Sequence, residues 1–333
     1  MRRFDLDWLR ISAFALLIVY HAGMLYVPWD FHVKSDYRGG PALLAPLLLG
    51  MAVVVVPQVY FEVSQAGRYR GDFVAFWGRY LRLDQSFGTP VPTWNHLWFV
   101  AYLLIYSLTV AALAPKPSGS ALSARAEPSR AAVVALLFAP WVWLWLLRTT
   151  LFPRFGSTHA MADDGYNHAL YFSMFLFGYS LVGRPLLGLA IDRLRWPALA
   201  LALTGGAVYV ALSLGAGEAL PPGEWRLGVG RAGREALAWG AVLAALGFGQ
   251  RHLNHDHRWR AYLAEAVFAY YIVHQTALIA LSVWLEPLQL GGPLEAALVI
   301  AGTLMACVAS AELARRTRWL RPLFGFSARP SRG

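Results

Sequence analysis

Apolar runs of about 20 residues recur along the whole chain, and no other feature constrains the fold as strongly. A helix of that length crosses the hydrocarbon layer of a bilayer. No polar stretch between the runs is long enough to build a soluble core. The sequence therefore predicts an all-α, polytopic transmembrane helix bundle. We expect one membrane-embedded domain over residues 1–333, with a basic cytoplasmic tail at 313–333.

The composition supports insertion into a lipid bilayer. Hydrophobic residues make up 57% of the chain and charged residues 14%, against roughly 25% charged residues in soluble domains. The net charge of +10 comes mostly from arginines at the ends of the apolar runs. Basic residues in such positions orient membrane helices and do not indicate nucleic-acid binding. The single cysteine, Cys307, excludes an intramolecular disulfide framework.

Hydropathy predicts about nine membrane spans, with ends uncertain by several residues. They cover residues 8–27, 42–61, 96–114, 132–152, 167–188, 196–216, 232–250, 261–284 and 293–312.

Loop charge reveals a topological conflict near the N-terminus. Basic residues at both ends of the chain predict a cytoplasmic N-terminus and a cytoplasmic C-terminus. Alternation backward from the tail places residues 251–260, 184–195 and 115–131 inside, and residues 217–231, 153–166 and 62–95 outside. Alternation forward from the N-terminus places residues 28–41 outside as well. A predicted span at 42–61 nevertheless separates these two segments. One crossing is therefore missing between His21 and Glu62, or the segment 42–61 does not span.

Two polar residues lie within the first apolar run, "RISAFALLIVYH". Arg10 and His21 are separated by three helical turns, or about 16 Å, and share one helical stripe with Asp7, Leu17 and Met24. Charged and imidazole groups at membrane depth mark functional sites. Histidine suits general-base chemistry, and arginine can hold an anionic group. The alternative is that Arg10 extends to the cytoplasmic headgroups while His21 hydrogen-bonds a neighbouring helix.

The stretch "FDLDWLRISAFALLIVYHAGMLYVPWDFHVK" resembles the start of the membrane acyltransferases of acyltransferase family 3, whose signature is an arginine and a histidine at this spacing. The segments "VVVVPQVYFE", "WNHLWFVAYLLIYSL", "YNHALYFSMFLFGYSL" and "YYIVHQTAL" resemble the branch of the osmoregulated periplasmic glucan succinyltransferases. The resemblance covers most of the chain.

The resemblance implies an inner-membrane O-acyltransferase. It implies transfer of an acyl group from a cytoplasmic donor, acyl-CoA, to a hydroxyl of an extracytoplasmic glycan, with no bound cofactor. His21 and Arg10 would be catalytic: His21 would deprotonate the acceptor hydroxyl, and Arg10 would position the donor. A transporter or flippase, and an inactive truncated family member, are the alternatives.

The sequence departs from the family pattern just after the first predicted span. Family members carry there a second span that ends in a small-residue segment, followed by paired cytoplasmic arginines. Here "SDYRGG" runs almost directly into "PALLAPLLLGM", so that section is absent. Loop charge and family pattern therefore point to the same deletion at 28–42, natural or introduced by a sequence error. Arg79 and Arg82 have the paired spacing, but loop charge places them outside, so the family role is not transferred to them.

Other residues are candidates for binding substrate. His96 and His274 are explained equally by burial among aromatic residues and by a role in the site. Tyr166 and His168 lie beside Asp163 and Asp164 in a predicted outer loop, which could hold a sugar or be a solvated helix cap. We assign substrate binding to one set of residues: Asp7, His96, Trp98, Tyr166, His168 and His274.

Two apparent motifs carry no function. The histidines of "RHLNHDHRWR" match no zinc signature and lie in a basic loop, so no metal site is predicted. The glycines of "GVGRAG" have dinucleotide-binding spacing, but no strand precedes them and they lie between membrane helices.

Overall fold

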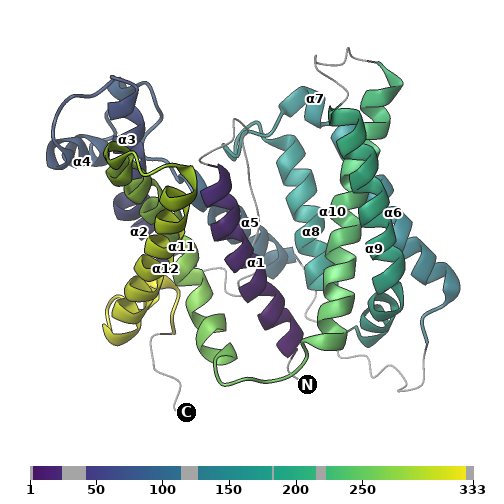
Figure 1. Ribbon diagram of the computed structural model, residues 1–333. Coiled ribbons are helices and arrows are strands. Elements are labelled where there is room, and N and C mark those ends of the chain that lie inside the picture. The colour runs from purple at the N-terminus through teal and green to yellow at the C-terminus, as the bar shows by residue number, and fades with distance from the viewer. Residues whose placement is uncertain (1–2, 25–42, 114–126, 182–183, 215–222, 328–333) are drawn as a thin grey trace. The chain divides into compact units, whose positions relative to one another are not determined.

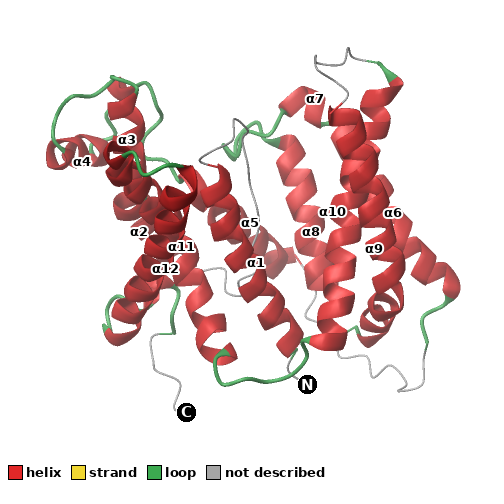
Figure 2. Ribbon diagram, in the orientation of Figure 1, coloured by secondary structure: helices red, strands yellow, loops and turns green. Residues whose placement is uncertain are grey.

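The computed structural model describes residues 3–24, 43–113, 127–181, 184–214 and 223–327, and the regular elements in these ranges are helices (Figures 1 and 2). The predicted all-α fold class is confirmed. Within the described residues, six helical stretches have the length and apolar content of a membrane span: Leu44–Gln65, Asn95–Leu113, Arg130–Phe155, Pro185–Ser213, Arg260–Leu288 and Gly292–Arg316. The three other predicted spans correspond to α1 (Phe4–Met24), α8 (Gly165–Leu181) and α10 (Trp225–His252).

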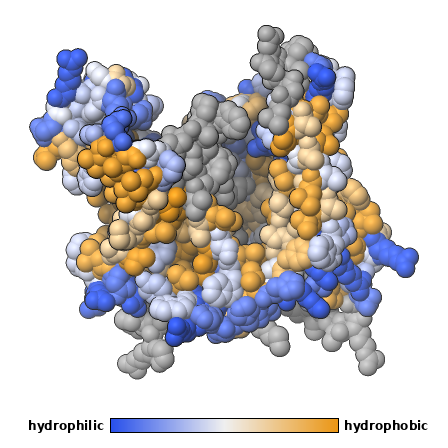
Figure 3. Space-filling model, in the orientation of Figure 1, coloured by the Kyte–Doolittle hydropathy of each residue, from blue (hydrophilic) through white to orange (hydrophobic). Residues whose placement is uncertain are grey.

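Large apolar side chains lie on the outer surface of these helices. Leu203 is 64% exposed and Met305 is 68% exposed, and orange apolar surface covers the flanks of the helices in Figure 3. A soluble protein rarely leaves so many large apolar side chains in water. The exposed apolar surface agrees with helices that face lipid.

The chain divides into two compact units. The first unit contains Met1–Leu9 and Leu113–Asp256, and the second contains Arg10–Ala112 and His257–Gly333. The boundary falls inside α1, between Leu9 and Arg10. The single functional domain over residues 1–333 stays a prediction.

Helices of the first unit pack with small residues at their interfaces. These helices are α6 (Arg130–Thr150), α7 (Phe152–Phe155), α8, α9 (Pro185–Leu214) and α10. Gly233, Gly240 and Gly247 recur every seven residues on α10 and face α9. A Cβ atom at Gly240 would lie 2.6 Å from the carbonyl oxygen of Ala198. Small residues let membrane helices approach this closely. Gly233 of the dinucleotide-like motif is therefore a packing residue within a helix.

One end of the first unit gathers several of the segments predicted to be cytoplasmic. The Phe4 amide donates to the side chain of Asn254, and Leu9 lies against Gly249 of α10. Gly247 in turn contacts Arg195 near the start of α9. The turn after α10, the first turns of α1 and the basic segment at 184–195 thus share one end of the unit, as the alternation of loop charge requires.

The second unit contains α1 from Arg10, α2 (Leu44–Leu49), the π-helix η2 (Gly50–Val54), α3 (Val56–Gln65), α4 (Phe73–Leu81), α5 (Trp98–Leu113), α11 (Arg260–Leu285) and α12 (Gly292–Arg316). Short 3-10 helices connect them: η3 (Gln85–Phe87), η4 (Asn95–Leu97), η5 (Glu286–Leu288) and η6 (Pro322–Phe324).

Two consecutive long helical segments of the second unit run in the same direction. Along α1, Arg10 contacts Ala264 and Phe14 contacts Tyr270 and His274, so α1 is parallel to α11.

The segment from α2 to α3 is also parallel to α11. It begins beside η6 at the tail, where Arg321 pairs with Glu265, and it passes Thr276 at Val54. Successive membrane helices joined by a short loop normally run in opposite directions. The parallel arrangement agrees with the charge conflict in the sequence. The segment 28–42, on which the predicted deletion falls, lies outside the described residues.

Candidate active site

Arg10 lies at the start of the α1 segment in the second unit. Its Nη2 atom donates a hydrogen bond to the carbonyl oxygen of Ala264 at 2.5 Å. Further along the same helix, Phe14, Leu17 and Ile18 are buried. The contact with α11 places the guanidinium at the end of the unit that also holds Arg321 of the tail. Arg10 is partly buried and lies two helical turns before the buried Leu17, a member of the same predicted stripe.

His21 lies in the last turns of α1, and its side chain is outside the described residues. The helix does run without interruption from Phe4 to Met24, so the predicted separation of three turns from Arg10 holds for the backbone. The catalytic roles of both residues stay predictions.

His274 is completely buried in the middle of α11. Its Nδ1 atom lies 2.7 Å from the carbonyl oxygen of Tyr271. A carbonyl only accepts, so Nδ1 carries a proton. The ring meets Phe14 of α1 edge to face, with a centroid distance of 5.6 Å. His274 thus links the predicted stripe of α1 to the interior of the second unit.

His96 lies beside His274, in the 3-10 helix η4 that precedes α5. The two imidazole centroids are 5.3 Å apart, and the ring planes are nearly perpendicular. The Nε2 atom of His96 lies 3.0 Å from the carbonyl oxygen of Ile272, and its Nδ1 atom lies 3.2 Å from the amide nitrogen of Gln58. These partners fix a neutral imidazole that donates from Nε2 and accepts at Nδ1. The sequence pattern predicted both histidines, and the fold brings them together.

Gln58 connects three segments that are far apart in the chain. Its amide nitrogen donates to the Thr276 hydroxyl at 2.6 Å, and its oxygen accepts from Asn95 at 3.3 Å. The side chain is 3% exposed. We name Gln58, Asn95, His96, His274 and Thr276 the polar cluster. Gln58, Asn95 and Thr276 were not among the predicted site residues, although a glutamine after "VVVVP" in an apolar run is a visible signal for Gln58.

The π-helix η2 explains part of this cluster. Pro57 has no backbone N–H group to donate. The backbone N–H of Gln58 donates to the Val55 carbonyl, not to the Val54 carbonyl four residues earlier. The Val54 carbonyl accepts instead from the Thr276 hydroxyl at 2.6 Å. In α4, Trp77 donates to the Ala52 carbonyl at 2.8 Å. Side chains from α11 and α4 thus satisfy two carbonyl groups of the π-helix. π-Helices often occur at functional sites.

Trp98 lies in the first turn of α5, next to this cluster in the sequence. It is buried and packs edge to face on Tyr102, with a centroid distance of 5.6 Å. The rings around Trp98 are aromatic. Its contact with substrate stays a prediction.

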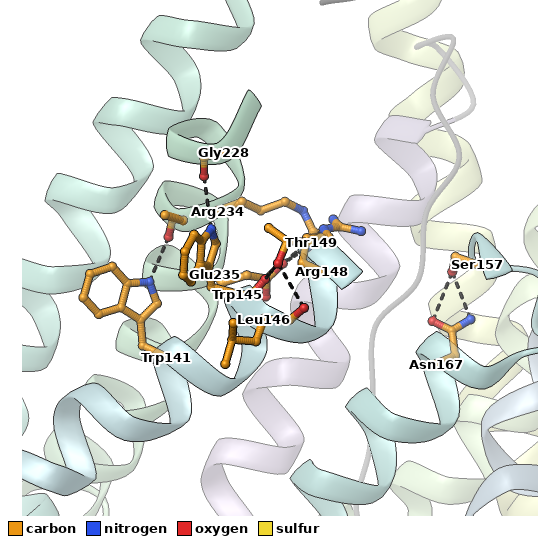
Figure 4. Close-up of polar contacts among 11 residues, drawn as sticks. Trp141, Trp145, Leu146, Arg148, Thr149, Ser157, Asn167, Gly228, Arg234 and Glu235 are labelled. Carbon is orange, nitrogen blue, oxygen red and sulfur yellow. Dashed lines mark hydrogen bonds and ion pairs between the residues drawn. The ribbon is translucent and has the colours of Figure 1, made fainter. Parts of the chain in front are cut away.

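Tyr166, His168 and Asp7 belong to the first unit, apart from the group around His274. Tyr166 is buried and lies near Arg148, whose guanidinium carbon is 5.5 Å from the ring centroid. His168 has its Nε2 atom 2.7 Å from the carbonyl oxygen of Met161. Nearby, Asn167 bonds Ser157 (Figure 4). Asn167 also donates to the buried Asp164 at 2.9 Å. The segment 157–168 is therefore held by internal hydrogen bonds.

A pair of arginines in this unit was not singled out by the sequence analysis. Arg148 of α6 and Arg234 of α10 both pair with the buried Glu235, at 3.2 Å and 2.6 Å (Figure 4). The sequence does show Arg148 near the end of one apolar run and "RE", Arg234 and Glu235, inside another. Their pairing depends on how α6 and α10 pack.

The arginines at 79 and 82 lie in the connection between α3 and α5. Arg79 donates to Asp84 at 2.7 Å and to Ser86 at 2.7 Å, and Arg82 is exposed. Hydrogen bonds from the Ser86 amide and from Arg79 lower the pKa of Asp84 to about 2. In the same connection, burial raises the pKa of the Tyr80 hydroxyl. Arg79 is therefore bound within its own loop.

Among the side chains that the structure describes, no group of three or more histidine, cysteine and carboxylate residues could hold a metal ion. His252 and His255 are exposed, and His255 lies beside the Trp8 ring at 6.3 Å.

The sequence model of a family described as an acyltransferase domain matches residues 37–312. The chain belongs to acyltransferase family 3. The matched region includes the polar cluster and both described arginine pairs, and it begins after α1. No curated protein and no solved structure matches this family 3 acyltransferase.

Proposed function

We propose that this membrane acyltransferase transfers an acyl group from acyl-CoA in the cytoplasm to a hydroxyl of an extracytoplasmic glycan, as an inner-membrane member of the glucan succinyltransferase branch. Family membership supports acyl transfer. One observation carries the proposed path: Arg10 lies at the tail end of the second unit, and the same helix continues past the buried His274 toward His21.

The distribution of arginines supports the proposed orientation. The end of the second unit that holds Arg10 also holds Arg315, Arg316 and Arg321. Cytoplasmic segments carry an excess of basic residues. Arg10 then lies on the side of acyl-CoA, and both chain ends are cytoplasmic. The end of α3 and the loop at 66–94 lie on the side of the glycan.

The chemistry assigns one role to each member of the Arg10 and His21 pair. The His21 imidazole removes the proton of the acceptor hydroxyl as its oxygen attacks the thioester carbonyl. The new C–O bond forms, the C–S bond breaks, and the proton passes to the leaving thiolate. A histidine near neutral pKa suits both proton transfers. Arg10 holds a phosphate of the donor as a fixed cation.

His274 contacts Phe14 of α1, and His96 lies beside His274, so we propose that both histidines shape the acceptor end of the site. Trp98 would add an aromatic surface. The substrate-binding roles of Asp7, Tyr166 and His168, which belong to the first unit, stay predictions.

Comparison of glycan acylation in cells tests this proposal. A strain without the gene is complemented with the wild-type chain, with His21→Ala or with Arg10→Gln, and its envelope and periplasmic glycans are compared by mass spectrometry. We expect only the wild-type chain to restore an acyl substituent. His252→Ala is the matched control, since that exposed histidine lies outside the proposed site. An identical acyl pattern in every strain would exclude the proposal and leave a transporter, flippase or inactive member.

Topology reporters test the orientation separately. Reporters fused after Trp29 and after Arg70 are expected on the extracytoplasmic side, and a reporter at the C-terminus on the cytoplasmic side. Because α1 and α3 run in the same direction in the second unit, opposite locations for the first two reporters would contradict the arrangement.

A further inference from the structure

A cluster of unbalanced charge lies at one end of the first unit. Arg148 is 12% exposed, Arg234 is 42% exposed, and both share the single carboxylate of Glu235, which is 3% exposed (Figure 4). Two guanidinium groups and one carboxylate leave one positive charge. Charged groups at membrane depth are costly, so they are kept where they bind or transfer something.

The cluster lies at the end of the unit with α7 and the start of α10, away from Asn254 and the first turns of α1. Other arginines at this end have carboxylates nearby: Arg226 pairs with Glu224, and Asp163 and Asp164 lie between α7 and α8. Arg148 and Arg234, by contrast, share one carboxylate. On the orientation predicted from loop charge this end is extracytoplasmic, where basic residues are normally scarce. A negatively charged ligand would balance the positive charge that this pair retains.

Aromatic rings fix the deeper arginine. The Arg148 guanidinium carbon lies 4.4 Å from the centroid of Phe152 and 5.5 Å from that of Tyr166. Stacking on rings leaves the edge of a guanidinium to donate hydrogen bonds in its own plane. Glu235 takes one part of that edge, and the carboxylate keeps the two cations close together.

An apolar groove lies deeper on the same three helices. Its volume is about 300 Å³, and Pro140, Trp143, Met174, Phe177 and Trp239 are among its lining residues. Pro140 precedes Arg148 by eight residues along α6, which corresponds to about 12 Å. The headgroup layer of one leaflet is roughly 5–8 Å thick. A phosphate at the arginines would therefore place an attached acyl chain at the depth of the groove.

We propose that the first unit binds a phosphate-bearing lipid of the extracytoplasmic leaflet, with its phosphate on Arg148 and Arg234 and one acyl chain in the groove lined by Met174 and Phe177. Arginine donates bidentate hydrogen bonds to phosphate as well as to carboxylate oxygens, so the donors that Glu235 leaves can hold a phosphate. The groove favours a lipid over a soluble phosphate, because only a lipid has an apolar chain that can occupy it. The proposal rests on the orientation above and is independent of the acyl-transfer chemistry.

Native mass spectrometry of the purified full chain tests this site with three probes. Phosphatidylglycerol carries phosphate and chains, diacylglycerol with the same chains lacks the phosphate, and glycerol phosphate lacks the chains. We expect phosphatidylglycerol to bind most tightly. Arg234→Gln removes charge-assisted hydrogen bonds and is expected to weaken its binding roughly tenfold. The matched control is Arg226→Gln, an exposed arginine on the same helix, which is expected to leave binding unchanged.

A second pair of variants tests the groove. Met174→Trp fills it, whereas Leu176→Trp adds the same ring on an exposed position of the same helix. We expect weaker phosphatidylglycerol binding for the first variant alone. Equal binding of diacylglycerol and phosphatidylglycerol would overturn the phosphate contact. Glycerol phosphate binding as tight as that of phosphatidylglycerol, or equal effects within either variant pair, would overturn the lipid site.

Discussion

The two units of the chain bury polar groups in different ways. In the second unit, neutral side chains from α3, η4 and α11 satisfy one another in the polar cluster. In the first unit, glycine-lined contacts between α9 and α10 bring backbones together, and the paired charges lie at one end. Neutral hydrogen-bonding groups cost less to bury than charges do. The second unit can thus hold ordered imidazoles deep among its helices, where the site chemistry is proposed.

Among substitutions that distinguish the two units, Gln58→Leu is expected to lower the free energy of unfolding most. The change removes the donor to Thr276 and the partner of His96 Nδ1, and it leaves these groups buried without Gln58. An unsatisfied buried group costs roughly 1–3 kcal/mol, so we expect a loss of roughly 3 kcal/mol in the free energy of unfolding. Thermal unfolding of the purified chain in detergent measures this loss.

A matched substitution on the same helix controls for the change in apolar surface. Gln65 lies at the exposed end of α3, so Gln65→Leu is expected to alter stability by less than roughly 0.5 kcal/mol. If both variants unfolded at the same temperature as the wild-type chain, the polar cluster would not stabilise the second unit.

The sequence predicts individual residues of this site better than it predicts their partners. Arg10 stands out because an arginine inside an apolar run is rare, and His96 and His274 stand out within family-like segments. Gln58 and Thr276 meet across more than 200 residues, as the hydrogen bond between them shows. That pairing depends on the π-helix and on the register of α3 against α11. Neither follows from hydropathy, which reports only which segments are apolar.

The directions of the helices were likewise only partly predictable from the sequence. Loop charge identified the conflict between His21 and Glu62 from the sequence alone. Contacts along α11 then showed that α1 and the α2–α3 segment are parallel. The glycines of α10 are an opposite case, because their spacing resembled a nucleotide motif while their role is helix packing. Whether a glycine pattern binds a ligand or packs a helix depends on which segment of the fold lies against it.

The next effect, on the first unit, is expected from Gly240→Ala. The new methyl group would lie 2.6 Å from the Ala198 carbonyl oxygen and 2.7 Å from the Ala202 amide nitrogen, so α9 and α10 must separate. Overpacking of this kind costs about 1–3 kcal/mol, and we expect about 2 kcal/mol from thermal unfolding. Gly228→Ala is the control, because a Cβ atom there meets open space. A stable Gly240→Ala variant would show that the close contact is dispensable.

The smallest effect is a coupling between Trp239 and Pro140 inside the first unit. Pro140 has no N–H group to bond the Leu136 carbonyl of α6, and the Trp239 indole donates to that oxygen at 3.1 Å. Trp239→Phe removes this donor along with some packing volume. Pro140→Ala supplies a backbone donor in its place.

A double-mutant cycle separates the hydrogen bond from the lost volume. We expect Trp239→Phe to cost about 0.6–1 kcal/mol less in the Pro140→Ala background than in the wild-type chain, the usual contribution of one hydrogen bond between membrane helices. Chemical unfolding of the four proteins in the same detergent measures the difference. Equal costs in both backgrounds would mean that the indole fills space and that its N–H group contributes nothing to the pairing of α6 with α10. In that case the pairing of α6 with α10 would rest on apolar packing, on the Arg148–Glu235 ion pair and on the indole hydrogen bonds of Trp141 and Trp145.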